Sequence, residues 1–138
     1  GRQLRPPLAF SFAGDIPVYA LPSTYDALDN QIANQDLNGI VFTDAPWILA
    51  DYDPLKANAA SSLRPAQGAV QRFRAMGIDS FRLYARLTQL QNREITSLPG
   101  ATGLLSVDEN GRIHRRLEVA RFVDGKATLE GNTGAASD

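Results

Sequence analysis

The stretch GIVFTDAPWIL, residues 39–49, decides the fold of this chain. Its apolar run, residues 40–42, shows no alternation of apolar and polar side chains. Such a run is typical of a strand buried on both faces, as in a parallel sheet covered on both sides by helices. The run stops just before Asp44, and a proline and the only tryptophan of the chain follow. The stretch therefore predicts a buried strand that ends in a corner, in an α/β fold.

Two residues of this corner are candidates for binding a ligand or a partner. Asp44 follows the predicted strand, and open α/β sheets bind ligands beyond the carboxyl ends of their strands. Trp47 offers a flat apolar anchor. In the alternative interpretation, Asp44 bonds nearby backbone N–H groups and Trp47 packs between a helix and the sheet. Tyr19 and Tyr25, at and after the end of the preceding strand, are candidates with the same alternative.

The sequence before the corner predicts a shorter strand. IPVYAL, residues 16–21, contains β-branched and aromatic residues and is bounded by prolines. Ser23 with Asp26 three residues later imitates a capping box, so we expect a short helix there. Short helices are also expected over residues 7–13 and after the Asp-Pro pair at 53–54.

After the corner, apolar residues recur at three-residue steps and predict two consecutive helices. The first is expected to end at Gly77, and Asp79 is expected to cap the second. A stripe of this kind is typical of a helix face that packs into a core. The residues of the two stripes are Val70, Phe73 and Met76, and then Phe81, Tyr84, Leu87 and Leu90.

The C-terminal third predicts an antiparallel meander. Strand-like segments at residues 103–107, 112–122 and 126–129 are separated by the turn dipeptides Asn110-Gly111 and Asp124-Gly125. The middle strand is expected to be half exposed. One face would carry Ile113, Leu117 and Val119, and the other His114, Arg116 and Glu118.

Composition narrows the function classes. The chain has 138 residues, of which 43% are hydrophobic, so it is expected to be one globular domain. Its net charge is only −1, so it is expected to bind neither nucleic acid nor an anionic membrane. It has no cysteine, which excludes disulfides and thiolate catalysis, and no apolar run of the roughly 18 residues of a membrane span. Six arginines fall mostly on the predicted helices, and we interpret them as a solvated helix face rather than a phosphate-binding stripe. They are Arg64, Arg72, Arg74, Arg82, Arg86 and Arg93.

The sequence contains no pattern that indicates catalysis. His114, the only histidine, lies among basic residues and is interpreted as a surface side chain. The glycine-rich segment at 100–103 lacks the spacing and the lysine of a phosphate loop and is interpreted as a flexible entry into the meander. Carboxylates are paired only in turn-like sequence, as in Asp51 with Asp53 and Asp108 with Glu109. We therefore expect no catalytic residue, no cofactor and no metal, and predict that the chain is not an enzyme.

The order of four segments resembles the C-terminal domain of the LppC/LpoA lipoprotein family. The segments are PVYA (17–20), DLNGIVFTDAPWIL (36–49), FRAMGIDSFRLYARLTQL (73–90) and GATGLLSVDENGRIHRRLEVARFVDG (100–125). The resemblance covers about residues 1–127. Two departures concern the rim of the expected cleft: Leu21-Pro22 stand where the family pattern has Thr-Ser, and Thr43 stands where it often has cysteine.

The resemblance implies a function and a place in the cell. The family consists of periplasm-facing outer-membrane lipoproteins that activate a class A penicillin-binding protein, a peptidoglycan synthase. It implies a non-enzymatic regulator that docks on this synthase, with a small-ligand binding module, for a solute or a muropeptide, as the alternative. The membrane would be reached only through an N-terminal lipid anchor that this chain does not carry.

The resemblance also implies a partial fold. The family domain looks like a type I periplasmic binding protein, with two α/β lobes, and this chain is shorter than half of such a fold. We expect residues 1–129 to form one lobe with crossing helices and a meander, and residues 130–138 to form a flexible tail. The chain is interpreted as an excerpt, and a homodimer in which a second copy replaces the missing lobe is one possibility.

Overall fold

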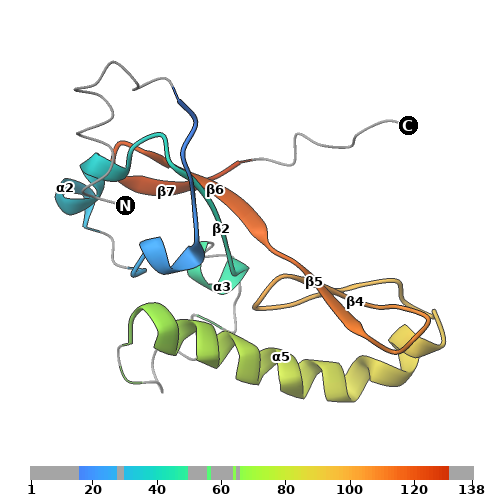
Figure 1. Ribbon diagram of the computed structural model, residues 1–138. Helices are drawn as coiled ribbons and strands as arrows, with labels where there is room; N and C mark the ends of the chain where they lie inside the picture. Colours follow the sequence, from blue (N-terminus) through green and yellow to red (C-terminus); the bar gives the residue numbers. More distant parts are fainter. Residues whose placement is uncertain (1–15, 28–29, 50–55, 57–63, 65, 131–138) are drawn as a thin grey trace.

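The structure is a computed structural model that describes residues 16–27, 30–49, 56, 64 and 66–130. The short helices expected over 7–13 and after 53–54 lie outside these ranges, as does the expected tail beyond residue 130. The elements, labelled as in Figure 1, are β1 (Tyr19–Ala20), the 3₁₀ helix η1 (Pro22–Thr24), α2 (Gln31–Asn34), the 3₁₀ helix η2 (Gln35–Leu37), β2 (Val41–Asp44), α3 (Pro46–Leu49), α5 (Gly68–Gln91), β3 (Leu98–Pro99), β4 (Leu104–Val107), β5 (Ile113–Arg116), β6 (Glu118–Val123) and β7 (Lys126–Leu129).

These strands form two sheets. The first sheet has the order β1-β2-β6-β7, with β1 parallel to β2 and the other pairs antiparallel. The second sheet has the order β3-β4-β5 and is antiparallel throughout. Figure 1 shows β5 and β6 as one continuous course of the chain that joins the two sheets, with the long helix α5 running beneath them. The expected α/β architecture with an antiparallel extension is confirmed.

The predicted strand and corner are both present. Val41 and Phe42, which point to opposite faces of β2, are both buried, as the absence of alternation predicted. Pro46 then begins α3 directly after the strand. Proline suits the first turn of a helix because the N–H that it lacks would have no partner inside the helix there. The sequence 39–49 therefore folds locally as the pattern indicated.

The core of the first sheet is built around aromatic side chains. The rings of Phe42 and Phe122 stack with their centroids 4.9 Å apart. Tyr25 meets both rings edge-on, at 5.7 and 5.5 Å. Leu37 and Ile40 are fully buried beside them. A fully buried aromatic ring removes roughly 150–250 Å² from water, so Phe42 and Phe122 contribute most to the burial in this region, with the half-buried Tyr25 packed against them.

A second buried cluster joins the corner to α5. It consists of Ala45, Trp47, Ala75 and Ala101, with Ile48 and Ile78 packed against it. Three of its four buried members are alanines, so α3, α5 and the loop before β4 approach one another closely. This cluster fixes the position of α5 relative to the end of β2.

The two consecutive helices predicted over residues 70–90 are instead one helix. α5 runs through Gly77 without interruption. A glycine inside a helix costs only about 1 kcal/mol relative to alanine, and the 24 residues of α5 absorb that cost. Asp79 lies in the interior of the helix and is buried, so its prediction as an N-cap is wrong.

The predicted core face of these helices is also wrong for most of its residues. Leu90 is buried, as expected, but most of the other large apolar residues are exposed. Their exposed fractions are 52% for Val70, 69% for Phe73, 46% for Met76, 79% for Phe81 and 87% for Tyr84. The side that packs inside the described structure contains Ala75 and Asp79 instead. Apolar spacing shows that a helix has an apolar face, but it does not show what covers that face.

The predicted middle strand of the meander is divided between the two sheets. Residues 113–116 form β5 and residues 118–123 form β6, with Leu117 between them. In β6 the buried residues are Ala120 and Phe122, so the expected core position of Val119 is wrong. Both predicted turns, at 110–111 and 124–125, connect antiparallel strands as expected.

Two further predictions near the N-terminus need correction. β1 contains only Tyr19 and Ala20, because Pro17 and Pro22 lie so close on either side. Ser23 lies within the 3₁₀ helix η1 and does not cap an α-helix. The α-helix of this region is α2, and its N-cap is Asn30, whose side chain accepts a hydrogen bond from the N–H of Ala33 at 3.1 Å.

Candidate functional site

Asp44, the first candidate, ends β2 and forms a buried ion pair with Arg72 of α5. The carboxylate is 2% exposed and accepts two hydrogen bonds from the guanidinium, from Nε to Oδ1 at 3.0 Å and from Nη2 to Oδ2 at 2.5 Å. Oδ1 also accepts the N–H of Ala45 at 2.8 Å, next to the start of α3. The structure therefore places Asp44 at the junction of strand, corner and helix, with both oxygens occupied by groups of this chain.

Arg72 ties a third segment to the same place. Its Nη2 donates to the carbonyl oxygens of Pro22 at 2.7 Å and Tyr25 at 2.9 Å. One guanidinium thus joins β2, α5 and the segment after β1, using the fixed fork geometry that suits arginine to such sites. The expectation that Arg72 belongs to a solvated face is wrong, since its side chain is only 23% exposed and bonded on three sides.

Trp47, the second candidate, belongs to α3, packs against α5 and is 4% exposed. Its indole N–H donates to the side-chain oxygen of Gln71 at 2.9 Å, and its backbone N–H donates to the carbonyl of Ala101 at 2.9 Å. A buried indole needs such a hydrogen-bond acceptor. The ring is therefore held by contacts within the chain.

The two tyrosines lie in different environments. Tyr25 is half-buried and packs on the aromatic core. Tyr19 is 76% exposed on β1, which is an edge strand of the first sheet. Of the four candidates, the structure thus brings Asp44 and Trp47 to the same corner, puts Tyr25 in the adjoining core and leaves Tyr19 on the surface.

Sequence analysis missed a second buried carboxylate. Asp79, 2% exposed, accepts the backbone N–H of Ala101 at 2.6 Å and that of Thr102 at 2.7 Å, and the hydroxyl of Thr102 at 2.5 Å. A side chain at Gly100 would place its Cβ 2.7 Å from this carboxylate, so only glycine fits there. The segment at 100–103 therefore anchors the entry to β4 on α5. The sequence signal that could have indicated this contact is an aspartate within a helical pattern, Asp79, together with the glycine-rich segment at 100–103.

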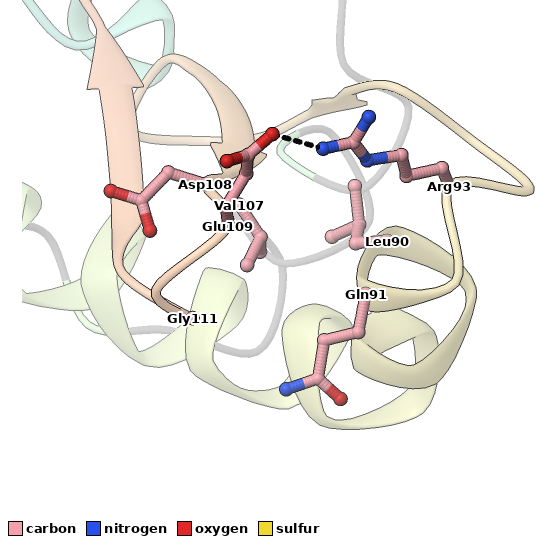
Figure 2. A pocket seen from close by; sticks show the side chains of 7 residues that line it. All are labelled: Leu90, Gln91, Arg93, Val107, Asp108, Glu109 and Gly111. Atoms are coloured by element: carbon pink, nitrogen blue, oxygen red, sulfur yellow. Dashed lines mark hydrogen bonds and ion pairs between the residues drawn. The ribbon is translucent and has the colours of Figure 1, made fainter.

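A pocket of about 460 Å³ lies where the end of α5 meets the β4–β5 hairpin. Figure 2 shows Leu90, Gln91 and Arg93 on one side, with the side chains of Arg93 and Glu109 pointing toward each other. The lining residues on the other side are Val107, Asp108, Glu109 and Gly111. These two form an exposed ion pair at 2.8 Å. The pocket lies at the opposite end of α5 from Arg72.

Asp108 organises the rim of this pocket. Its Oδ1 accepts the N–H groups of Asn110 and Arg112, both at 2.9 Å, and its Oδ2 lies 2.9 Å from Nε2 of His114. The hydrogen bond with His114, and then the one from Arg112, lowers the pKa of Asp108 below its ordinary value of 3.8. His114 is exposed on β5, as predicted. In the structure this carboxylate therefore stabilises the turn between β4 and β5.

Two negative findings concern the described ranges of the chain. Within them, the histidine and carboxylate side chains form no group of three or more that could hold a metal ion. No helix in the same ranges, including the 24-residue α5, is apolar enough over sufficient length to cross a membrane.

The sequence profile of the family described as "LppC putative lipoprotein" matches residues 1–125. The chain belongs to this family. Among its relatives, "Penicillin-binding protein activator LpoA" of Vibrio antiquarius is 34% identical over 62% of this chain and 14% of its own length. The protein of the same name from Edwardsiella ictaluri is 30% identical over 80% of this chain and 16% of its own length. The chain therefore spans about one-seventh of the curated relatives that it matches.

Solved structures show the same fold. The LpoA C-domain from Haemophilus influenzae, described as a regulator of PBP1A, superposes with a TM-score of 0.73 at 24% identity, over 94% of this chain and 41% of that domain. A "putative branched-chain amino acid ABC transporter" from Chromobacterium violaceum gives 0.63 at 25% identity, over 84% and 38%. The expected family and the expected periplasmic-binding-protein-like fold class are both confirmed.

Proposed function

We propose that this chain is part of a non-enzymatic regulator, an outer-membrane lipoprotein facing the periplasm that binds and activates a class A penicillin-binding protein. The observation that carries the proposal is the family match over residues 1–125, together with relatives whose name is penicillin-binding protein activator. The H. influenzae domain with the same fold is described as a regulator of PBP1A. In this proposal the membrane is reached through a lipid anchor outside this chain, and residues 1–129 form part of a periplasmic-binding-protein-like domain followed by a tail at 130–138.

Activation by docking requires a difference in affinity. A regulator shifts a synthase toward its active conformation only if it binds that conformation more tightly than the inactive one. Tyr19 is the proposed contact among the four candidates, because it is exposed on an edge strand. Asp44 and Tyr25 would contribute by holding the corner and the segment after the edge strand in place through their contacts with Arg72. Trp47 would contribute by fixing the corner on Gln71 of α5.

The test is reconstitution of the complete gene product with its cognate synthase. Glycan polymerisation and peptide cross-linking are expected to rise on addition of the regulator, and Tyr19→Ala is expected to reduce the stimulation while leaving the unfolding temperature unchanged. Ile32→Ala is a matched control, because Ile32 is also exposed but lies on α2, away from the edge strand. Absence of both stimulation and binding by the unaltered protein would refute the proposal.

A second candidate is a small-ligand binding module, for a solute or a muropeptide. The fold shared with the C. violaceum transporter chain favours it, as does the pocket at the β4–β5 hairpin. A thermal-shift screen with amino acids and muropeptides tests it, because a ligand that binds only the native state raises the unfolding temperature. A shift abolished by Asp44→Ala would assign the ligand to the corner, whereas one abolished by Glu109→Ala would assign it to the hairpin pocket. No shift with any of these compounds would count against this second candidate.

A further inference from the structure

β5 is an edge strand of the second sheet. The order of that sheet is β3-β4-β5, so among the described residues β5 has β4 on one side and no strand on the other. All four residues of β5 are exposed. Figure 1 shows the β4–β5 hairpin projecting away from the first sheet, at a distance from the edge strands β1 and β7. We call the unpaired side of residues 112–116 the β5 edge.

The pairing with β4 shows which backbone groups of the β5 edge are unbonded. In an antiparallel pair, residues that exchange hydrogen bonds alternate with residues that do not. The N–H of Asp108 donates to the carbonyl of Arg112 at 3.0 Å, which fixes the alternation, and His114 bonds to β4 in the same way. Ile113 and Arg115 therefore direct their N–H and C=O groups away from β4.

These outward groups form a template for a further strand. Ile113 and Arg115 each offer one donor and one acceptor, separated by the two-residue repeat of a strand, about 6.6 Å. An extended peptide presents matching groups at the same spacing and can add to such an edge through main-chain hydrogen bonds. The backbone alone does not select the peptide, so the selection depends on the side chains.

The side chains of the β5 edge are cationic. Arg112, Arg115 and Arg116 are exposed, and none of them forms an ion pair within the part of the chain that the structure describes. The carboxylates of the neighbouring turn have other partners, since Asp108 accepts backbone N–H groups of the turn and Glu109 pairs with the residue after the end of α5. The β5 edge therefore carries positive charge that these carboxylates do not pair.

The charges follow the period of a strand. Arg112, His114 and Arg116 occupy alternate positions and share one face, and Arg115 lies on the other. A strand that pairs with β5 has the same period of two, and its side chains lie opposite those of β5 on the same face. Acidic side chains at alternate positions of that strand would therefore lie beside Arg112 and Arg116.

We propose that the β5 edge binds an extended acidic segment of a partner protein, which adds to the second sheet beside β5. Charge complementarity favours this occupant. A second copy of β5 would place arginines opposite arginines, and like charges opposite each other destabilise a strand pair. Residues 112–116 include no Phe, Tyr or Trp on which nucleic-acid bases could stack. The inference does not rest on the proposed function, because the β5 edge and Tyr19 belong to different sheets.

Peptide binding to the complete gene product, followed by fluorescence anisotropy, is the first test. The probe is a dye-labelled octapeptide of alternating threonine and glutamate, and its Kd is expected to lie below about 1 mM. A peptide of the same composition with its four glutamates in one block is the control. It is expected to bind about fivefold more weakly, because only the alternating peptide places all its carboxylates on one face of a strand.

Charge reversal tests the role of the arginines. Arg116→Glu is expected to weaken binding of the alternating peptide about fivefold, because an exposed attraction becomes a repulsion. Lys126→Glu is the matched control, since Lys126 is an exposed cation on β7, the edge strand of the other sheet, and the change in net charge is the same. It is expected to leave the affinity within about twofold, because exposed charges beyond a Debye length are screened.

A backbone change separates strand addition from attraction between charges. Arg115→Ala and Arg115→Pro both remove the guanidinium, but only proline also removes the outward N–H. Proline is tolerated on an edge strand when its N–H side faces solvent. Arg115→Pro is therefore expected to weaken binding of the alternating peptide further than Arg115→Ala does.

Hydrogen exchange with residue resolution locates the bound peptide. In the complete gene product alone, the amides of Ile113 and Arg115 are expected to exchange at least about tenfold faster than those of His114 and Arg116, which bond to β4. A saturating concentration of the alternating peptide is expected to slow the exchange of Ile113 and Arg115.

Several results would overturn the proposal. Slow exchange of Ile113 and Arg115 without peptide would show that another part of the protein already covers the edge. Equal affinity for the alternating and block peptides would show attraction between charges without strand addition. No binding of the alternating peptide at about 1 mM would exclude the proposed occupant. If phosphatidylglycerol vesicles bound instead, and Arg116→Glu abolished that binding, the surface would belong to a membrane.

Discussion

β5 and β6 follow one another along the chain, yet they are held in different ways. β6 contributes Ala120 and Phe122 to the core of the first sheet, between β2 and β7. β5 exposes all four of its residues, and the buried residue beside it is Leu105 of β4. The first sheet is stabilised by apolar burial, whereas the second sheet is held to α5 by the hydrogen bonds that the loop before β4 donates to Asp79. We therefore expect apolar burial to dominate the stability of the first sheet, and the Asp79 carboxylate to dominate that of the second.

Phe122→Ala is expected to have the largest effect. Removing a fully buried ring from the aromatic core loses its burial and leaves a cavity, which costs about 4 kcal/mol. Urea unfolding measures the loss. Ile113→Ala in β5 is the matched control and should cost less than about 1 kcal/mol, because that side chain is half exposed. Equal losses for the two variants would remove the difference between the sheets.

Asp79→Ala should come next, at about 3 kcal/mol. It leaves the N–H groups of Ala101 and Thr102 and the hydroxyl of Thr102 buried with no acceptor. Asp79→Asn keeps one acceptor oxygen and should lose less. Hydrogen exchange should show faster opening of β4 than of β2 in Asp79→Ala. Equal exchange rates in β2 and β4 of this variant would contradict the view that different interactions stabilise the two sheets.

Arg93→Ala should change stability by less than about 0.5 kcal/mol. The ion pair with Glu109 lies at the surface, where both side chains are more than 70% exposed and water screens the charges. Urea unfolding at low and high salt measures the change. A loss above about 1 kcal/mol would show that the second sheet depends on this pair as well as on Asp79.

Asp108 should give the smallest effect, visible as a dependence on pH. Because His114 and backbone N–H groups hold its folded pKa below 3.8, its contribution is present above that pH and is lost as the pH falls through the folded value. In His114→Ala the titration midpoint of Asp108, followed by NMR, should rise toward 3.8. An unchanged midpoint would show that the backbone hydrogen bonds alone lower it.

Patterns that depend on neighbouring residues were predictable from the sequence. The buried strand at 40–42, the corner at Pro46 and the turns at 110–111 and 124–125 all depend on local backbone preferences. The segments carrying the family resemblance also include the loop and helix that meet at Asp79. Local sequence was therefore sufficient to predict these elements and the family.

Contacts between distant residues were not predictable. Asp79 was interpreted as a cap because capping is its commonest local role, and its partners lie 22 and 23 positions away. Arg72 lies 28 residues from Asp44, so its burial could not be inferred from the helix alone. The large apolar residues of α5 are predicted from their spacing to face the core, although most of them are exposed in the structure. The spacing identifies an apolar face of the helix but not what packs against it.

The continuity of β5 and β6 through Leu117 constrains how this gene can change in length. β5 pairs with β4 in one register and β6 with β2 in another, and a single residue separates the two. Inserting or deleting one codon at Leu117 would shift one strand by one position and turn all its side chains to the opposite face. Substitutions at Leu117 are expected to be tolerated, whereas frame-preserving insertions and deletions there should be absent from functional variants.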